Sequence, residues 1–258
     1  MILVKYSKDN LNLLKELSYN RFKLNDANTF LGFFWSFLNP LLLLSVLYLI
    51  FNIKFGNSVE NYGIYLLIGI VHYNHFSSTT SSSMRVLRSM RALTSNTIFP
   101  KEILVYSSIF SNLITFLISV FICIIFALVT GLHLSSSYIM LPVIIVMQLL
   151  LVIWISLILS CVFVIVRDIE HIYQVFLRVL FFACPIFYDI SILGDGLGKK
   201  IAQLNPLTHL MTFTRAVLLE GQFISLYAIG MFCIINLCLI IISLIIFKRL
   251  EAKFVEYL

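Results

Sequence analysis

Long apolar runs dominate the pattern of hydrophobic and polar positions along this chain. The stretch from Ile103 to Val166 contains no Asp, Glu, Lys or Arg, and it is broken once, by the short polar segment Gly131–Ser137. A helix of about 20 apolar residues crosses the hydrocarbon core of a bilayer. The pattern therefore predicts two membrane-spanning helices, Ile103–Thr130 and Tyr138–Val166, joined by a tight turn.

Four further apolar stretches are long enough for additional spans. They are Phe30–Phe51, Tyr62–Ser83, His171–Tyr188 and Phe223–Phe247. Within lipid the backbone must satisfy its own hydrogen bonds, so only helices and closed barrels span a membrane. Barrel strands alternate apolar and polar residues, whereas these runs are continuously apolar. We therefore predict an all-α, polytopic membrane helix bundle with six spans.

Three segments differ from both spans and simple loops. Residues 5–24 place Lys, Asp and Glu on one helical face and leucines on the other, which is typical of a helix in the membrane interface. Met84–Leu93 separates arginines from apolar residues and predicts a short basic helix. The segment 189–222 carries glycines and Asn205-Pro206, which favours two short half-inserted outer helices. The expected organisation is thus an interface helix in 1–29 and a bundle in 30–258 that includes a coupling segment in 84–102 and the outer segment.

Composition and charge agree with this reading. Hydrophobic residues make up 60% of the chain, charged residues 12%, and the mean hydropathy is +1.01. Most of the 18 Lys and Arg residues lie before the first span, after the second, after the fourth and after the sixth. Short cytoplasmic loops accumulate basic residues, so both termini are expected in the cytoplasm.

The sequence offers no catalytic, metal or nucleotide site. The phosphate-binding pattern GxxxxGK[ST] is absent, and Gly131 is the only glycine between Gly69 and Gly194. His72 and His75 are spaced like a metal pair but lack an evident third ligand. The five cysteines lie in apolar runs without a CxxC pair, and we interpret them as packing residues. Any ATP-driven work must therefore come from another chain, and no cofactor is assigned.

The second half of the predicted second span is unusually polar, from His72 to Ser83. Small hydroxyl residues favour close helix packing, while so dense a polar run also fits a helix that lines a hydrated route. Arg178 either faces the bundle interior or snorkels to the inner interface. Aromatic rings beside polar groups would suit carbohydrate. The candidate substrate-path residues are His72, Tyr73, Asn74, His75, Ser78, Ser82, Arg178, Phe182 and Tyr188.

Four motifs occur in order along the chain. Leu31–Pro40 reads LGFFWSFLNP, and FPKE follows at Phe99–Glu102. RDI at Arg167–Ile169 precedes PIFY at Pro185–Tyr188, and NPL begins at Asn205, upstream of Arg215 and Gly221. This ordered set resembles the membrane subunits of ABC-2 type exporters of bacterial polysaccharides, including O antigen, teichoic acid and capsule. The serine run and Arg178 depart from that pattern.

The resemblance implies a non-enzymatic subunit in a bacterial cytoplasmic (inner) membrane. Two copies would form one channel for lipid-linked polysaccharide and bind two copies of a separate ABC ATPase that holds ATP and Mg²⁺. Membrane lipids are implied partners; nucleic acid is not. The expected ATPase-coupling residues are Arg85, Leu87, Arg88, Met90, Arg91 and Arg167. Two alternatives remain open: an ABC-2 exporter of a drug or lipid, and a membrane-embedded acyltransferase built on the His- and Ser-rich span.

Overall fold

A computed structural model describes residues 8–26, 35–56, 59, 61–96, 99–133, 135–252 and 254. The regular elements in these ranges are helices, which confirms the all-α polytopic bundle. The elements are α1 (Lys8–Asp26), α2 (Trp35–Phe55), α3 (Tyr62–Ser89), α4 (Arg91–Asn96), α5 (Glu102–Val129), η2 (Ser136–Met140), α6 (Leu141–Ile165), α7 (Ile169–Ala183), η3 (Ile190–Leu193), α8 (Leu197–Leu204), α9 (Pro206–Leu218) and α10 (Leu226–Glu251).

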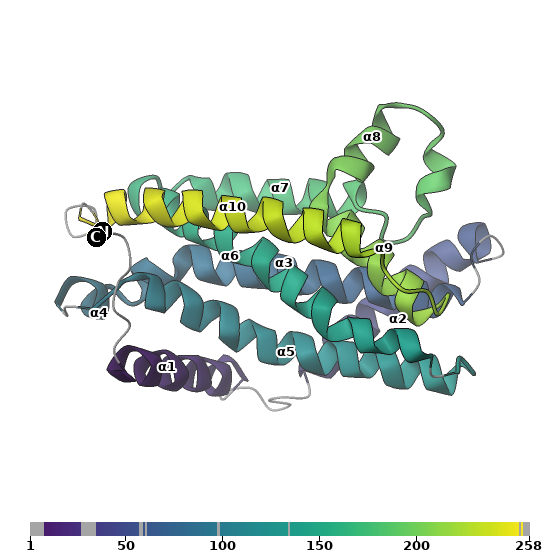
Figure 1. Ribbon diagram of the computed structural model, residues 1–258, viewed down its shortest axis with the longest axis horizontal. Helices are drawn as coiled ribbons and strands as arrows, with labels where there is room; N and C mark the ends of the chain where they lie inside the picture. The colour runs from purple at the N-terminus through teal and green to yellow at the C-terminus, as the bar shows by residue number, and fades with distance from the viewer. Residues whose placement is uncertain are drawn as a thin grey trace.

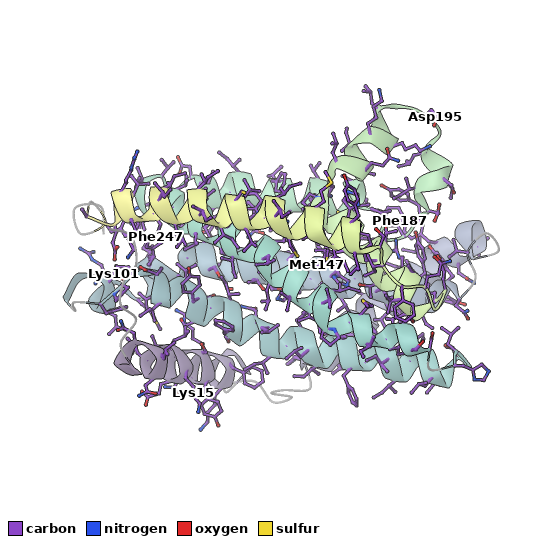
Figure 2. All side chains as sticks on the ribbon, viewed as in Figure 1. Lys15, Lys101, Met147, Phe187, Asp195 and Phe247 are labelled. Atoms are coloured by element: carbon purple, nitrogen blue, oxygen red, sulfur yellow. The ribbon has the colours of Figure 1, made fainter. Side chains whose placement is uncertain are left out.

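The long helices run side by side along the molecule (Figure 1). α3 lies at the centre, where it packs against α2, α5, α6 and α9. Leu66, Leu67 and Ile70 on α3 and Met147 on α6 are fully buried, and Figure 2 shows Met147 in the middle of the bundle. α10 packs on α6, and α1 packs on α5. The helix that carries the polar run is therefore the innermost helix of the protomer.

Three helices of the described chain are long and apolar enough to cross a membrane by themselves: α5, the continuous Ser136–Ile165 segment and α10. The apolar part of α2, Leu38–Ile53, is shorter. α3 has 28 residues, which is sufficient length, but its second half is polar. The chain is thus a multi-pass membrane protein. Its central helix is surrounded mainly by other helices of the chain and not by lipid.

The fifth predicted span, His171–Tyr188, is wrong in its extent. The helix α7 ends at Ala183, because Cys184 precedes Pro185 and adopts an extended conformation with ψ of 143°. The α region is sterically disfavoured for a residue before proline. The 15 residues of α7 rise by about 22 Å, which is less than the thickness of the hydrocarbon core.

The separate helix predicted at Met84–Leu93 is also wrong. α3 continues to Ser89, and only the short helix α4 follows. No glycine or proline occurs between Gly69 and Pro100, so nothing in the sequence terminates the helix after the polar run. Met84, Val86 and Leu87 are fully buried within the same chain. Most of the apolar face expected to bind a partner is therefore already covered, while Leu93 remains 38% exposed.

α1 corresponds to the amphipathic helix predicted for residues 5–24, and it extends to Asp26. Residues 5–7 lie outside the described part of the chain. It packs along α5, with Ser18 buried and Leu17 against the core. Lys15 projects away from the bundle (Figure 2). Part of its apolar face is thus covered by protein, while Leu11 and Tyr19 remain exposed.

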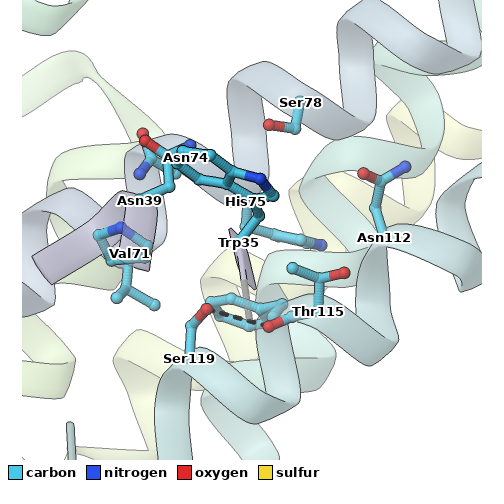
Figure 3. Close-up of a pocket in the computed structure, with 11 residues that line it drawn as sticks. Trp35, Asn39, Val71, Asn74, His75, Ser78, Asn112, Thr115 and Ser119 are labelled. Atoms are coloured by element: carbon cyan, nitrogen blue, oxygen red, sulfur yellow. Dashed lines mark hydrogen bonds between the residues drawn. The ribbon is translucent and has the colours of Figure 1, made fainter. Parts of the chain in front are cut away.

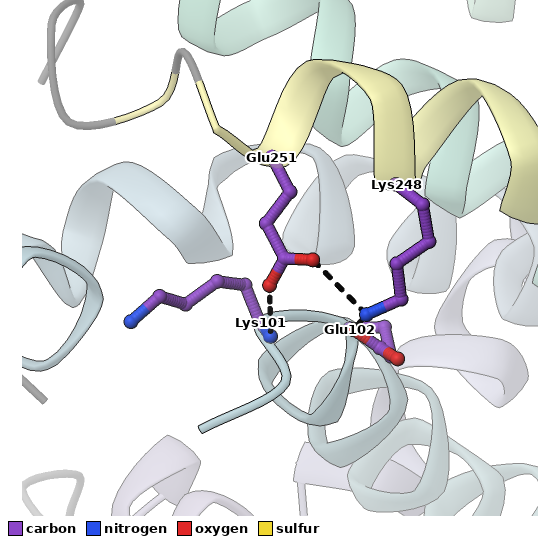
Figure 4. A network of polar contacts seen from close by, with 4 residues as sticks. All are labelled: Lys101, Glu102, Lys248 and Glu251. Carbon is purple, nitrogen blue, oxygen red and sulfur yellow. Dashed lines mark hydrogen bonds and ion pairs between the residues drawn. The ribbon is translucent and has the colours of Figure 1, made fainter. Parts of the chain in front are cut away.

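One end of the bundle, the basic end, carries the ends of α3, α6 and α10 and the starts of α5 and α7. Lys248 near the end of α10 binds Glu102 of α5 (2.8 Å) and Glu251 (3.0 Å). The backbone N–H of Lys101 donates to the Glu251 carboxylate (3.0 Å; Figure 4). Glu102 is only 2% exposed, so this ion cluster ties α5 to α10 from a largely buried position.

The opposite end holds the segment 189–222. α8 projects from the bundle beside the loop that carries Asp195 (Figures 1 and 2). α9 instead returns into the bundle and packs on α3 and α6, with Thr214 and Arg215 buried. The hydroxyl of Ser137 donates to the Val217 carbonyl (2.8 Å) and anchors the end of α9 to the turn before α6.

Candidate functional site

The polar half of α3 borders two adjoining cavities. The first has a volume of about 470 Å³ and lies between α3, α5 and α7. It is lined by Tyr73, Ser77, Ser78, Ser81, Ser82, Arg85, Asn112, Gln174, Leu177 and Arg178. The second, the His75 cavity, has a volume of about 230 Å³ and lies between α2, α3 and α5 (Figure 3). Both include Ser78 and Asn112, so we call the two together the polar groove.

Helical periodicity explains why one side of α3 faces the groove. Asn74, Ser78, Ser81 and Arg85 recur at spacings of three and four residues and share a face. Thr79 and Ser83 lie on the other side and are fully buried. Part of the polar run therefore packs against neighbouring helices, and part lines a cavity.

Ser82 belongs to both groups. Its hydroxyl lies 3.0 Å from the Ser108 hydroxyl of α5 and accepts a hydrogen bond from the Asn112 side-chain amide (3.0 Å). The same amide donates to the Ser108 carbonyl (2.8 Å). These contacts fix Asn112 at the point where the two cavities meet. They also leave the Asn112 side-chain oxygen without a hydrogen bond inside the described chain.

The two histidines of α3 are buried in a network with α6 and α9. His72 contacts Gln148 through Nδ1 (3.2 Å) and Thr214 through Nε2 (2.8 Å). The Gln148 side-chain nitrogen contacts His75 Nδ1 (3.2 Å) and donates to the His72 carbonyl (3.3 Å). His72 thus lies in the core and outside the groove, whereas His75 also lines the smaller cavity. In the described ranges no group of three or more potential metal ligands comes together.

The groove wall formed by α7 is held by the hydrogen bonds of two tyrosines. The Tyr73 hydroxyl donates to the Leu177 carbonyl (2.6 Å), and the Tyr173 hydroxyl donates to Thr80 (2.6 Å). Arg178 is exposed at this wall. Phe182 is exposed outside the groove, and the Tyr188 hydroxyl donates to the Ala183 carbonyl (3.1 Å). Neither Phe182 nor Tyr188 lines the groove in a single protomer.

The proposed coupling residues divide into two groups. Arg85 forms an ion pair with Glu170 (2.9 Å), and Arg88 lies over the Phe163 ring, near enough to Arg91 and Arg167 to interact electrostatically. These arginines collect at the basic end. Leu87 is fully buried, and Met90 is partly buried between α3 and α4. Arg85, Arg91 and Arg167 are therefore exposed for contact with another protein, whereas Leu87 is not.

Sequence reasoning missed Arg215, which it counted as an outer-side residue. Its guanidinium donates to the Tyr65 and Ile186 carbonyls (3.1 Å each) and lies 3.4 Å from the centre of the Tyr65 ring. It joins α9, α3 and the turn after α7. The sequence analysis also overlooked Asn112 and Gln148, although they are the only carboxamide side chains between Ile103 and Val166, a signal that could have found them.

Comparison with known proteins agrees with this architecture. The family model for ABC-2 type transporters matches residues 12–219. The O-antigen export system permease protein RfbA of Myxococcus xanthus is 26% identical over 95% of this chain and 94% of its own length. A Klebsiella pneumoniae protein of the same name is 25% identical over 100% of this chain and 99% of its length. The matched region includes α3, the polar groove and α9, and the chain belongs to the ABC-2 type transporter family.

Proposed function

We propose that this chain is the transmembrane subunit of an ATP-driven exporter of lipid-linked polysaccharide, such as O antigen or a similar cell-surface glycan. The relatives of nearly equal length are named as O-antigen export permeases, which supports a glycan cargo. The observation that carries the proposal is the polar groove, which is built mainly from hydroxyl and amide side chains inside an otherwise apolar bundle. Such groups hydrogen-bond sugar hydroxyls without requiring charge on the cargo.

One protomer provides only one wall of a route. The groove is bounded on one side by α7, whose residues Val175, Phe176 and Val179 are exposed. Two copies related by a twofold axis would close it, since such pairing is the commonest form of homo-oligomer. A drug or lipid would be expected to use a more apolar lining, so the composition of the groove favours glycan among the alternatives considered.

Energy would come from a separate ABC ATPase at the basic end. Basic residues concentrate on the cytoplasmic side of membrane proteins, and this rule orients Arg88, Arg167 and Lys248 toward the cytoplasm. We place the contact at α4 and at the turn around Arg167, where exposed arginines would pair with acidic groups of the ATPase. Two ATPase copies would match two copies of this chain.

A deletion and complementation experiment tests the proposal. Loss of the gene is expected to abolish surface glycan while lipid-linked glycan accumulates inside the cell, because synthesis continues without export. The wild-type chain should restore export. Ser78→Phe should fail to restore it by filling the groove, whereas Val146→Phe, at an exposed position of α6, should succeed. Normal surface glycan in the deletion strain, with altered sensitivity to a drug, would reject glycan as the cargo.

A further inference from the structure

The imidazole of His75 presents an unused hydrogen-bonding atom beside the His75 cavity. The residue is 5% exposed, and its Nε2 has no hydrogen-bond partner in the described chain. The ring stacks on Phe116, with centroids 4.2 Å apart. Nδ1 is engaged by Gln148 on α6, and the cavity is formed by α2, α3 and α5. His75 also lines this cavity, so its ring lies between Gln148 and the cavity, and Nε2 itself is enclosed.

The Gln148 network determines which proton His75 carries. The Gln148 side-chain nitrogen lies 3.3 Å from the His72 carbonyl oxygen, so that atom must be the amide donor. When the same nitrogen donates to His75 Nδ1, that atom is unprotonated, and the Gln148 oxygen accepts from His72 Nδ1. Neutral imidazole keeps one N–H, so that of His75 is at Nε2. A buried donor without an acceptor is costly, so an oxygen from outside the chain that reaches this atom would stabilise it.

The residues that line the cavity indicate which class of ligand carries that acceptor oxygen. Its 11 lining residues include no Asp, Glu, Lys or Arg, so nothing there would neutralise a phosphate. The side chains of Asn39, Asn74, Ser78 and Thr115 make no hydrogen bond within the described chain. Trp35, 43% exposed, adds an aromatic face (Figure 3). The volume of about 230 Å³ far exceeds the about 10–15 Å³ that one water needs.

We propose that the His75 cavity binds one neutral sugar residue of the transported glycan. His75 Nε2–H donates to a sugar oxygen, the asparagine and hydroxyl groups bind neighbouring hydroxyls, and Trp35 packs on the apolar face of the ring. This inference rests on the proposed function and deepens it. The cavity is then a subsite that holds one sugar unit of the glycan, while the rest of the glycan lies along the groove.

Trp35 makes the subsite measurable. The chain has two tryptophans, and the other, Trp154, is bonded to Asn236 between α6 and α10. In a Trp154→Phe background, the purified complex with its ATPase in lipid nanodiscs is titrated with neutral methyl glycosides of the sugars found in the exported glycan. Saturable change in Trp35 fluorescence is expected, and inorganic phosphate should cause none.

His75→Asn tests the assigned donor, because the asparagine oxygen can replace Nδ1 as the acceptor for Gln148 while the Nε2–H is removed. Affinity for the responding glycoside should fall about three- to tenfold, as for loss of one neutral hydrogen bond. His133→Asn makes the same substitution at an exposed residue of the opposite end and should bind normally. Size-exclusion chromatography of each complex verifies that it is folded.

Two results would overturn the subsite. One is a Trp35 signal that no glycoside changes saturably; the other is binding that His75→Asn leaves at the wild-type affinity in a folded complex. In either case normal glycan export by the wild-type chain would leave the proposed function standing. Failure of the wild-type chain to restore export in the deletion strain would instead reject the proposed function itself.

Discussion

At the scale of single residues, α3 is closely packed where Arg215 crosses it. A Cβ placed on Gly69 would come within 3.0 Å of the Ile186 Cα and 3.2 Å of the Arg215 guanidinium. The guanidinium is buried and holds two backbone carbonyls. Gly69 therefore lets α9 and the turn after α7 approach α3 closely, and Arg215 fastens all three.

Gly69→Ala is expected to destabilise the protein by about 1–3 kcal/mol, because the added methyl overpacks a site bounded by backbone. Gly230→Ala is the matched control, since a Cβ there meets nothing within 4 Å; removing a helix-interior glycine should be neutral or stabilise α10 by up to about 1 kcal/mol. Thermal unfolding in detergent measures both. Equal unfolding temperatures for the two variants would contradict the close approach at Gly69.

Substitutions at Leu87 and Leu93 distinguish an effect on folding from an effect on binding of the ATPase. Leu87 is fully buried, so Leu87→Ser should lower the yield of folded protein, by analogy with the about 2–5 kcal/mol loss for Leu→Ala in cores. Leu93 on α4 is 38% exposed, and Leu93→Ser should leave folding intact while weakening copurification with the ATPase. A well-folded Leu87→Ser variant that fails to bind the ATPase would reverse these assignments.

At the scale of helices, the ion cluster of Glu102, Lys248 and Glu251 holds α5 and α10 together and contributes to stability. Lys248→Met would leave the buried Glu102 carboxylate without its cation, and loss of one partner from a buried pair costs about 3–5 kcal/mol. Lys248 is 30% exposed, so the lower end of that range is expected. Adding Glu102→Gln to the same variant should recover much of the lost thermal stability. A double variant less stable than Lys248→Met alone would contradict a paired role.

The sequence was sufficient for the helices whose signal is local. Uncharged runs identified α5, α6 and α10, and the glycines with Asn205-Pro206 indicated two short helices within residues 189–222, where α8 and α9 lie. The length of α3 and the roles of Met84 and Leu87 were not predictable in this way, because burial of its last turns depends on neighbours distant in sequence. Likewise, a histidine in a polar run looks the same whether it lines a cavity, as His75 does, or contacts Gln148 and Thr214, as His72 does.

At the scale of the whole molecule, α7 has one largely uncovered face. Ile172, Val175, Val179 and Phe182 form an exposed stripe at helical spacing beside the groove. If two copies close the route, this stripe lies near its counterpart. Val175→Cys or Val179→Cys, in a chain without native cysteines, should then form a disulfide-linked dimer in native membranes under mild oxidation.

Ile234→Cys is the control for this dimer, because Ile234 is 64% exposed on α10, away from the groove. It should remain monomeric. A dimer linked through Ile234→Cys and never through α7 would place the route elsewhere and leave the polar groove facing lipid.

The central claim, that the groove is a hydrated path for glycan, is tested most directly by thiol labelling along α3. Cysteines introduced singly at Ser77, Ser78, Thr79, Ser82 and Ser83 are exposed to a membrane-impermeant reagent. The groove-lining positions Ser77, Ser78 and Ser82 should react, and glycan held in an ATPase-arrested complex should slow the reaction. The buried positions Thr79 and Ser83 should stay unreactive. Protection of all five positions, or labelling that arrested glycan does not slow, would contradict the account.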